Sequence, residues 1–266
     1  MKRKIAFIVC FIFIAATALL WPQMVAAAQI ENYYTIDDIL DFGSENMTHS
    51  TEDGYAVTSV TITDPNVLEG LVNSGAVSLG PNGSLPTTVT IYRYVNQALP
   101  QEIADVFLVR EMASVTFIEP IIVQDLTIIK SNQRTYTANT FFSEDAVCDG
   151  DSLTDSYTGS GTVGWTTSMS SSIEVGGDIV SILEVKGAVS RELGSTIGVT
   201  LSFTKEHTTT APAGKIRYVR AYLNYSGFDY EAQYGLVRIA LGDAWTPCGI
   251  VFVHADYDYD PSDYFG

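Results

Sequence analysis

The longest regular pattern in the chain is an alternation of apolar and polar residues over positions 173–203. Eleven of its sixteen odd-numbered positions are Ile, Val, Leu or Phe, whereas the even-numbered positions are mostly polar, with Val180, Ile182 and Ala188 as exceptions. Because side chains alternate between the two faces of a β-strand, this period predicts strands with one apolar and one polar face. Its length favours a long two-faced ribbon over the short strands of an ordinary sandwich.

Glycine-containing triplets at residues 176–178 and 192–194 could divide this stretch into the strands of hairpins. A three-residue loop conserves parity between paired positions, so it would place Val175 opposite Ile179 and keep the alternation unbroken. We therefore predict β-strands through residues 179–193.

A helix over the same residues 179–193 is the alternative interpretation. Asp178 is a good N-cap, and Gly194 suits the position just beyond a helix C-terminus. Lys186 would lie on the otherwise apolar face of this helix and argues against it. The apolar residues near that face are Ile179, Ile182, Leu183, Val189 and Leu193.

The rest of the chain is predicted to be mainly β. A short helix is expected near 65–74, because Asp64 can cap it, Pro65 suits its first position and Gly75 follows it. Residues 148–164 are rich in Asp, Ser, Thr and Gly and are interpreted as a loop. Further strand-like runs lie at residues 55–63, 88–95, 114–118, 121–130, 135–142, 195–204 and 215–225.

These elements predict an elongated antiparallel sheet or sandwich with long amphipathic strands and a few short helices. We expect an N-terminal mainly β domain at residues 29–145 and a C-terminal β domain at 146–266 that carries the ribbon.

The first 28 residues have the composition of a secretory signal peptide. A basic start is followed by an apolar run at residues 5–20 and by small residues at 25–28, so cleavage after Ala28 is expected to give a soluble, secreted protein. These 28 residues carry three of the 14 basic residues and none of the 31 acidic ones, so cleavage would change the formal charge from −17 to −20. Such a charge argues against nucleic acid as a partner and against binding driven by anionic lipid.

Two cysteines remain after this cleavage, Cys148 and Cys248. In an oxidising compartment the simplest expectation for two cysteines is one disulfide. It would connect the start of the C-terminal domain to its last strand.

The two-faced Ser/Thr-rich stretch, the turn Ala211-Pro212-Ala213-Gly214 and the aromatic strand at 218–225 are similar to the middle part of exported Gram-positive proteins of the aerolysin and epsilon-toxin/Mtx2 type. The resemblance covers about residues 159–234 and is a pattern, not a fixed motif. It implies a secreted bacterial β-pore-forming protein whose copies assemble on a lipid membrane, through an unknown receptor or ligand, and each insert one amphipathic hairpin into a β-barrel. The apolar face of that hairpin would consist of Ile179, Leu183, Val185, Val189, Ile197, Val199, Leu201 and Phe203.

No catalytic arrangement is visible in the sequence, and we predict no enzyme activity and no cofactor. The run Gly159-Ser160-Gly161-Thr162-Val163-Gly164 is a literal GxGxxG, but it lacks the strand and helix of a nucleotide site and is interpreted as a flexible turn. Acidic clusters offer weak candidate ligands for calcium. Their members are Asp149, Asp151, Asp155, Asp256, Asp258 and Asp260.

Two other functional classes stay open beside pore formation. A non-enzymatic surface, matrix or ligand-binding protein could use the same ribbon, since alternation reports burial of one face and not what buries it. An extracellular hydrolase ranks last.

Overall fold

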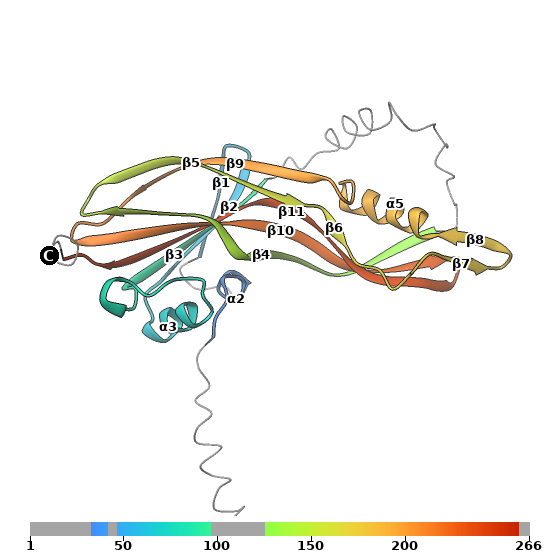
Figure 1. The fold of residues 1–266 in the computed structure, drawn as a ribbon, viewed down its shortest axis with the longest axis horizontal. Helices are drawn as coiled ribbons and strands as arrows, with labels where there is room; N and C mark the ends of the chain where they lie inside the picture. The colour runs from blue at the N-terminus through green and yellow to red at the C-terminus, as the bar shows by residue number, and fades with distance from the viewer. Residues whose placement is uncertain (1–32, 42–46, 97–125, 261–266) are drawn as a thin grey trace, which may run out of the picture.

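The computed structural model describes residues 33–41, 47–96 and 126–260 as an elongated, mainly antiparallel β-structure (Figure 1). The predicted signal peptide and the strand predicted at 114–118 lie outside these residues. Among the described helices, none is long and apolar enough to cross a membrane.

One large antiparallel sheet runs the length of the molecule, and we call it the main sheet. Its strand order is β1-β2-β3-β11-β10-β4, with the short β6 added to β11, so strands from both sides of residue 145 share it. The hairpin of β10 and β11 lies at the centre of this sheet. Its strands stay paired from Lys215 opposite Asp258 to Tyr234 opposite Val237. The strands are β1 (Met47–Glu52), β2 (Tyr55–Ile62), β3 (Thr88–Asn96), β4 (Leu126–Cys148), β6 (Gly164–Trp165), β10 (Lys215–Tyr234) and β11 (Val237–Asp258).

One face of the main sheet is covered by the N-terminal helices α2 (Ile36–Asp41) and α3 (Pro65–Asn73), which lie below it in Figure 1. A single 3₁₀ turn, η1 (Pro81–Gly83), follows α3. The helix predicted near 65–74 is confirmed: the Asp64 side chain accepts a hydrogen bond from the Asn66 N–H, and Pro65 opens the helix.

The other face is covered by two strands that pair only with each other, β5 (Ser152–Thr162) and β9 (Thr200–Thr210). We call this pair the ribbon. The prediction of a loop at 148–164 is wrong, because β5 is a regular strand whose partner lies about 50 positions later in the chain. The ribbon, the main sheet and the helices form three layers.

The segment between the ribbon strands, residues 163–199, is called the insert. After β6 it forms a small hairpin, β7 (Ser172–Val175) and β8 (Asp178–Ser181), and then the helix α5 (Ile182–Leu193). The hairpin turn has two residues, Gly176 and Gly177, both with positive φ, so Val175 lies opposite Asp178 and not opposite Ile179 as predicted. Glycine is needed at both positions because other residues avoid this conformation.

The strand predicted through 179–193 is present only at residues 179–181, in β8, and is wrong for 182–193, where the alternative helix is formed. Its N-cap is Ser181 and not Asp178: the Ser181 Oγ accepts from the Glu184 N–H at 3.3 Å, and the Glu184 carboxylate accepts from the Ser181 N–H at 2.6 Å. This reciprocal capping box starts the helix, and Gly194 ends it with a φ of 66°.

The predicted disulfide is also wrong for this structure, in which both cysteines are free thiols. Cys148 lies opposite Ile216 on β10, whereas Cys248 lies beside Asn224, whose Nδ2 donates to its Sγ at 3.3 Å. These two β10 positions differ by eight residues, about 26 Å along a strand, while disulfide-bonded Cα atoms lie within about 7 Å. Burial raises the pKa of the Cys248 thiol to about 12, which keeps it unreactive.

Candidate membrane-inserting segment

The outer face of the ribbon is a ladder of paired hydroxyl side chains. Every even position of β5 is Ser or Thr, and hydroxyls meet across the strands, as between Ser160 and Ser202 at 2.6 Å. Further pairs lie within 3.3 Å, namely Ser152 with Thr210, Thr154 with Thr208, Thr158 with Thr204 and Thr162 with Thr200. This face is exposed along the full length of the ribbon.

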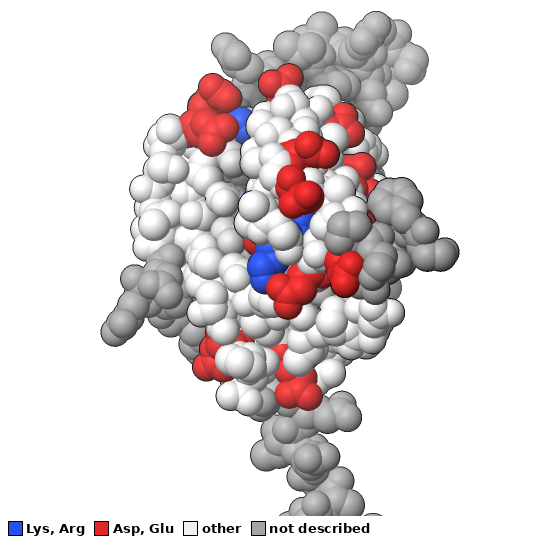
Figure 2. All heavy atoms as spheres, turned by 90° about the vertical axis from the view of Figure 1, so that its left-hand side faces the viewer, with Lys and Arg blue, Asp and Glu red and all other residues white. Residues whose placement is uncertain are grey.

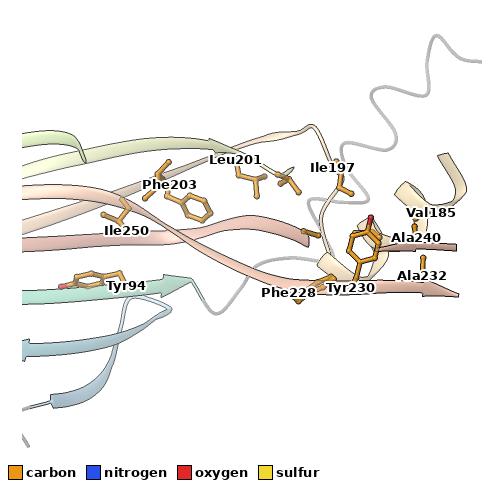
Figure 3. Close-up of a cluster of buried hydrophobic side chains, with 14 of the residues drawn as sticks. Tyr94, Val185, Ile197, Leu201, Phe203, Phe228, Tyr230, Ala232, Ala240 and Ile250 are labelled. Atoms are coloured by element: carbon orange, nitrogen blue, oxygen red, sulfur yellow. The ribbon is translucent and has the colours of Figure 1, made fainter. Parts of the chain in front are cut away.

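The inner face of the ribbon is apolar next to the insert. Leu201 and Phe203 of β9 point down towards the main sheet, where Tyr94 and Ile250 lie on neighbouring strands (Figure 3). Tyr157 of β5 packs edge-to-face on Phe252, with ring centroids 5.0 Å apart. These contacts form the hydrophobic core between the ribbon and the main sheet.

The same inner face becomes polar further along β9. The Lys205 side chain is only 7% exposed, and its Nζ lies 2.8 Å from Glu52 Oε1 and 3.1 Å from Asp53 Oδ2. Burial alone would lower the Lys205 pKa, but the hydrogen bonds to these two carboxylates raise it overall, so the lysine is charged. His207 follows on the same face and is also buried. A buried lysine is destabilising once its carboxylate partners move away, because its charge is then uncompensated. Lys205 therefore holds the ribbon against β1 only while Glu52 and Asp53 stay in place.

The GxGxxG glycines lie in β5 and in β6, with no helix N-terminus beside them, so the interpretation as a flexible turn is wrong. A Cβ at Gly159 would lie 2.6 Å from the Phe142 ring, and one at Gly161 would lie 2.7 Å from the Tyr225 hydroxyl. At Gly164 it would meet the Trp245 indole at 2.3 Å. These glycines therefore let β5 and β6 approach large side chains of the main sheet.

The insert is held on the far half of the main sheet by a few elements. Trp165 and Gly164 pair with β11, and the Thr166 N–H donates to the Asp243 carbonyl at 2.8 Å. Val185 of α5 points towards Ala232 and Ala240 of the sheet (Figure 3). Lys130 and Glu192 form an ion pair at 2.8 Å, but both side chains are at least a third exposed, so this pair adds little.

The helix α5 has weak local support. Three of its residues are β-branched, and Gly187 lies in its middle, where glycine costs about 1 kcal/mol relative to alanine. A Cβ at Gly187 would meet nothing within 4 Å, so packing does not require glycine there. The helix is therefore held mainly by its caps and by its contacts with the main sheet.

The regular register of the ribbon ends where the insert begins. Thr162 pairs with Thr200, and the Val163 N–H donates to the Val199 carbonyl at 2.9 Å as this register requires. The Val163 carbonyl, however, accepts from the Gly198 N–H at 2.8 Å and not from Val199, whose N–H donates to the Thr196 carbonyl at 3.2 Å. If the pairing of Thr162 with Thr200 continued through the whole insert, residues 163–179 would pair with 183–199 and residues 180–182 would form a three-residue turn.

That extended hairpin would be amphipathic on both strands. An antiparallel register with this parity places odd residues opposite odd residues, so both strands share one face. On the odd face twelve of nineteen residues are apolar and Arg191 is the only charge, whereas on the even face three of eighteen are apolar. The remaining charges of the insert all lie on the even face, at Glu174, Asp178, Glu184, Lys186 and Glu192.

The eight residues predicted as the membrane-inserting face are divided between α5 and β9 and their surroundings. Val185 and Val189 are fully buried on the main sheet, and Ile197, Leu201 and Phe203 are also buried. Val199 is half-buried at the end of the ribbon. Ile179 and Leu183 are instead 71% and 73% exposed. The structure thus hides most of this face and leaves part of it open.

The candidate calcium ligands do not form a cluster. Asp256 pairs with Arg217 at 2.6 Å, and Asp258 pairs with Lys215 at 2.6 Å. Asp149 accepts from the Gly214 N–H at 3.1 Å. Within the residues that the structure describes, no three His, Cys, Asp or Glu side chains are placed to hold a metal ion, so the calcium prediction gains no support. Figure 2, an end-on view, shows several groups of acidic side chains and only a few basic ones.

No protein-family model and no curated protein matches the chain. Its neighbours among solved structures are of aerolysin-like toxin type. One is the parasporin-2 toxin of Bacillus thuringiensis that recognizes cancer cells, with 15% identity, 51% of this chain and 70% of that chain covered, and a TM-score of 0.21. Another is an aerolysin-like protein of Bombina maxima, with 11% identity, 50% and 96% covered, and a TM-score of 0.23.

A third is the binary complex of Cry23Aa1 and Cry37Aa1, with 11% identity, 59% of this chain and 84% of that chain covered, and a TM-score of 0.15. The resemblance noted in the sequence is to the same group, and it is confirmed in that sense. Because all three TM-scores are low, the function proposed below rests on this chain's own residues.

Proposed function

We propose that this protein forms membrane pores by converting the insert into a β-hairpin that continues the ribbon. The observation that carries the proposal is the alternation of the insert: if the pairing of Thr162 with Thr200 is extended through its 37 residues, both halves place their apolar residues on one shared face. Packing of the ribbon alone does not explain why residues 182–193, which are helical in the structure, also keep the alternation of a β-strand.

The conversion keeps the ribbon and releases the insert. In the structure described above, which we call the packed form, β6 pairs with β11, and α5 covers the main sheet and buries part of the odd face. On release, α5 unfolds, and residues 183–193 lose their helical hydrogen bonds and gain strand pairing with residues 169–179. The apolar side chains that leave the main sheet are then buried in lipid, which replaces the lost hydrophobic contacts.

The length of the hairpin exceeds what a membrane needs. A membrane-spanning strand has about 9–11 residues, so residues 170–179 and 183–192 would suffice on the two sides of the turn at residues 180–182. Arg191 then lies at the end of the span nearest the water, opposite Ser171. The rest of the insert and the ribbon would form a stem outside the bilayer. This register differs from the hairpin turn first predicted at 192–194.

A single hairpin would leave unpaired backbone groups along both edges. Each such group costs several kcal/mol in hydrocarbon, so hairpins from several copies must pair edge to edge into a closed ring. We therefore propose a homo-oligomer as the active form and a lipid membrane as its partner.

We also propose that the protein is secreted, since the signal-like N-terminus would deliver it to the surface where such a ring acts.

Dye release tests this function. Purified protein is added to phosphatidylcholine vesicles and to target-cell membranes, with and without protease treatment, and each sample is analysed for detergent-resistant oligomers. We expect release together with a ring-sized oligomer. Neither release nor oligomer under any of these conditions would overturn the proposal and favour a non-enzymatic binding or structural protein.

A further inference from the structure

Two histidines meet in the buried interface between the ribbon and the main sheet. His207 of β9 and His254 of β11 are 8% and 3% exposed, and their Nε2 atoms lie 2.8 Å apart. At this distance one ring donates its N–H and the other accepts with a lone pair, so the contact needs at least one unprotonated ring. It is a side-chain hydrogen bond between the ribbon and the strand beneath it.

The surroundings of the pair are aromatic, with charged groups of both signs around them. His207 stacks on Phe252 of β11 with centroids 4.1 Å apart, and Tyr92 of β3 lies 5.0 Å from the His254 ring centroid. Thr209 Oγ1 lies 3.4 Å from His254 Nδ1. Tyr94 of β3 lies 6.1 Å from the His207 ring centroid. The charged groups around the pair are Glu52 of β1, Asp155 of β5, which is exposed and pairs with His207 in the ribbon, Lys205 of β9, Arg217 of β10, and Asp256 of β11, which binds Arg217 in a bidentate pair.

These surroundings disfavour protonation of both rings. Burial lowers the pKa of His207 to about 4, where Lys205 and Arg217 act in the same direction and Glu52 opposes them. Burial lowers the pKa of His254 to about 3, with help from His207 and Arg217. The usual histidine pKa is about 6.5. Both rings are therefore neutral in the packed form at neutral pH.

We propose that the His207–His254 pair is an acid-sensitive latch that holds the ribbon on the main sheet. When protons bind both rings, two N–H donors face each other between the layers, the hydrogen bond is lost, and two positive charges lie beside Lys205 and Arg217. Lifting β9 lets both rings reach water and accept their protons. The use of this latch as a trigger for insertion rests on the proposed function, but the latch itself does not.

The direction of the pH effect follows from proton binding. The lifted form has histidines near their usual pKa, so between pH 6.5 and about 4 it binds more protons than the packed form. The packed form therefore loses stability as the pH falls through that window. From pH 7 to pH 5, each histidine that becomes exposed increases the opening equilibrium about 20-fold.

Amide hydrogen exchange of β5 and β9 tests the latch in the absence of lipid. Opening constants, corrected for the intrinsic exchange rate, are compared at pH 7 and pH 5 for the wild type, for His207→Phe/His254→Phe, and for His254→Gln, which retains a neutral hydrogen-bonding partner. His49→Ala is the matched control, since His49 is the third histidine and lies on exposed β1.

We expect an increase of about 20-fold or more in the wild type and in His49→Ala, a smaller response in His254→Gln, and less than threefold in the double variant. Equal opening constants at the two pH values in the wild type would overturn the latch, as would a wild-type response in the double variant. Because no membrane is present, this result stands apart from dye release: a protein that never leaks can still show the latch.

Discussion

A disulfide between positions 166 and 243 should abolish pore formation until it is reduced. The Thr166 side chain hydrogen-bonds to the Asp243 carboxylate, and the Thr166 N–H donates to the Asp243 carbonyl, so the two side chains meet across neighbouring strands. Cysteines at such positions have the spacing that a disulfide requires. In Thr166→Cys/Asp243→Cys the oxidised bond would fix the start of the insert to β11, and dye release should fall to background and return on addition of reductant.

Two matched controls separate this lock from a general effect of cross-linking. Ser160→Cys/Ser202→Cys cross-links β5 to β9, which stay paired in both forms. Thr48→Cys/Ser59→Cys cross-links β1 to β2, away from the insert. The native hydroxyls of each pair lie within 2.7 Å of each other. Both oxidised controls should release dye like the wild type. Full release by the oxidised 166–243 variant would show that the insert need not leave the main sheet.

Ile173→Arg should remove pore formation without unfolding the packed form. Ile173 is 36% exposed on β7, so arginine can point into water there. In the proposed hairpin it faces lipid opposite Val189, two residues further into the bilayer than Arg191. Arginine on the lipid face costs from about 0–1 kcal/mol near the interface to about 2–4 kcal/mol at the midplane, and every copy in the ring incurs this cost.

The neighbouring substitution Ser172→Arg is the control, because Ser172 is also exposed in the packed form but lies on the even face. It should leave dye release within a fewfold of the wild type, and circular dichroism should show both variants folded with similar melting temperatures. An equal loss of dye release in both variants would show that odd positions do not face lipid and even positions do not face water.

The sequence allowed several elements to be predicted because their signals are local. Asp64 and Pro65 mark the start of α3, and the positions of α3, β9 and β10 follow from caps and alternation. The alternation also identified which side chains of β9 are buried, although Lys205 and His207 break it. Their burial depends on partners in distant strands, which alternation cannot show.

The helix α5 was only the alternative prediction, because its apolar residues satisfy two periods at once. Val185, Val189 and Leu193 are four residues apart, a spacing that lies on one face of a helix and also on one face of a strand. The signal that distinguishes them was present in Ser181 and Glu184, which have the spacing of a capping box. A segment with both periods has the property that the proposed conversion needs.

The strand β5 was missed because its alternation is carried by polar residues. Its even positions are all Ser or Thr, while the odd ones include Gly159 and Gly161, which carry no apolar signal. Those glycines are explained only by Phe142 and Tyr225 on the sheet below. The disulfide prediction failed for a similar reason, because the register that separates Cys148 from Cys248 is a property of the folded sheet.

In the proposed hairpin, residues 172 and 190 are direct neighbours in the membrane. In the packed form Ser172 pairs with Ser181, the N-cap of α5. Ser190 lies nine residues beyond Ser181 in this helix, which places it about 13 Å from Ser181 along the helix axis. We would therefore oxidise Ser172→Cys/Ser190→Cys, in a Cys148→Ser background, before and after binding to vesicles. We expect a disulfide within one chain only in the membrane-bound oligomer. Oligomers that release dye without forming this bond would rule out the proposed hairpin.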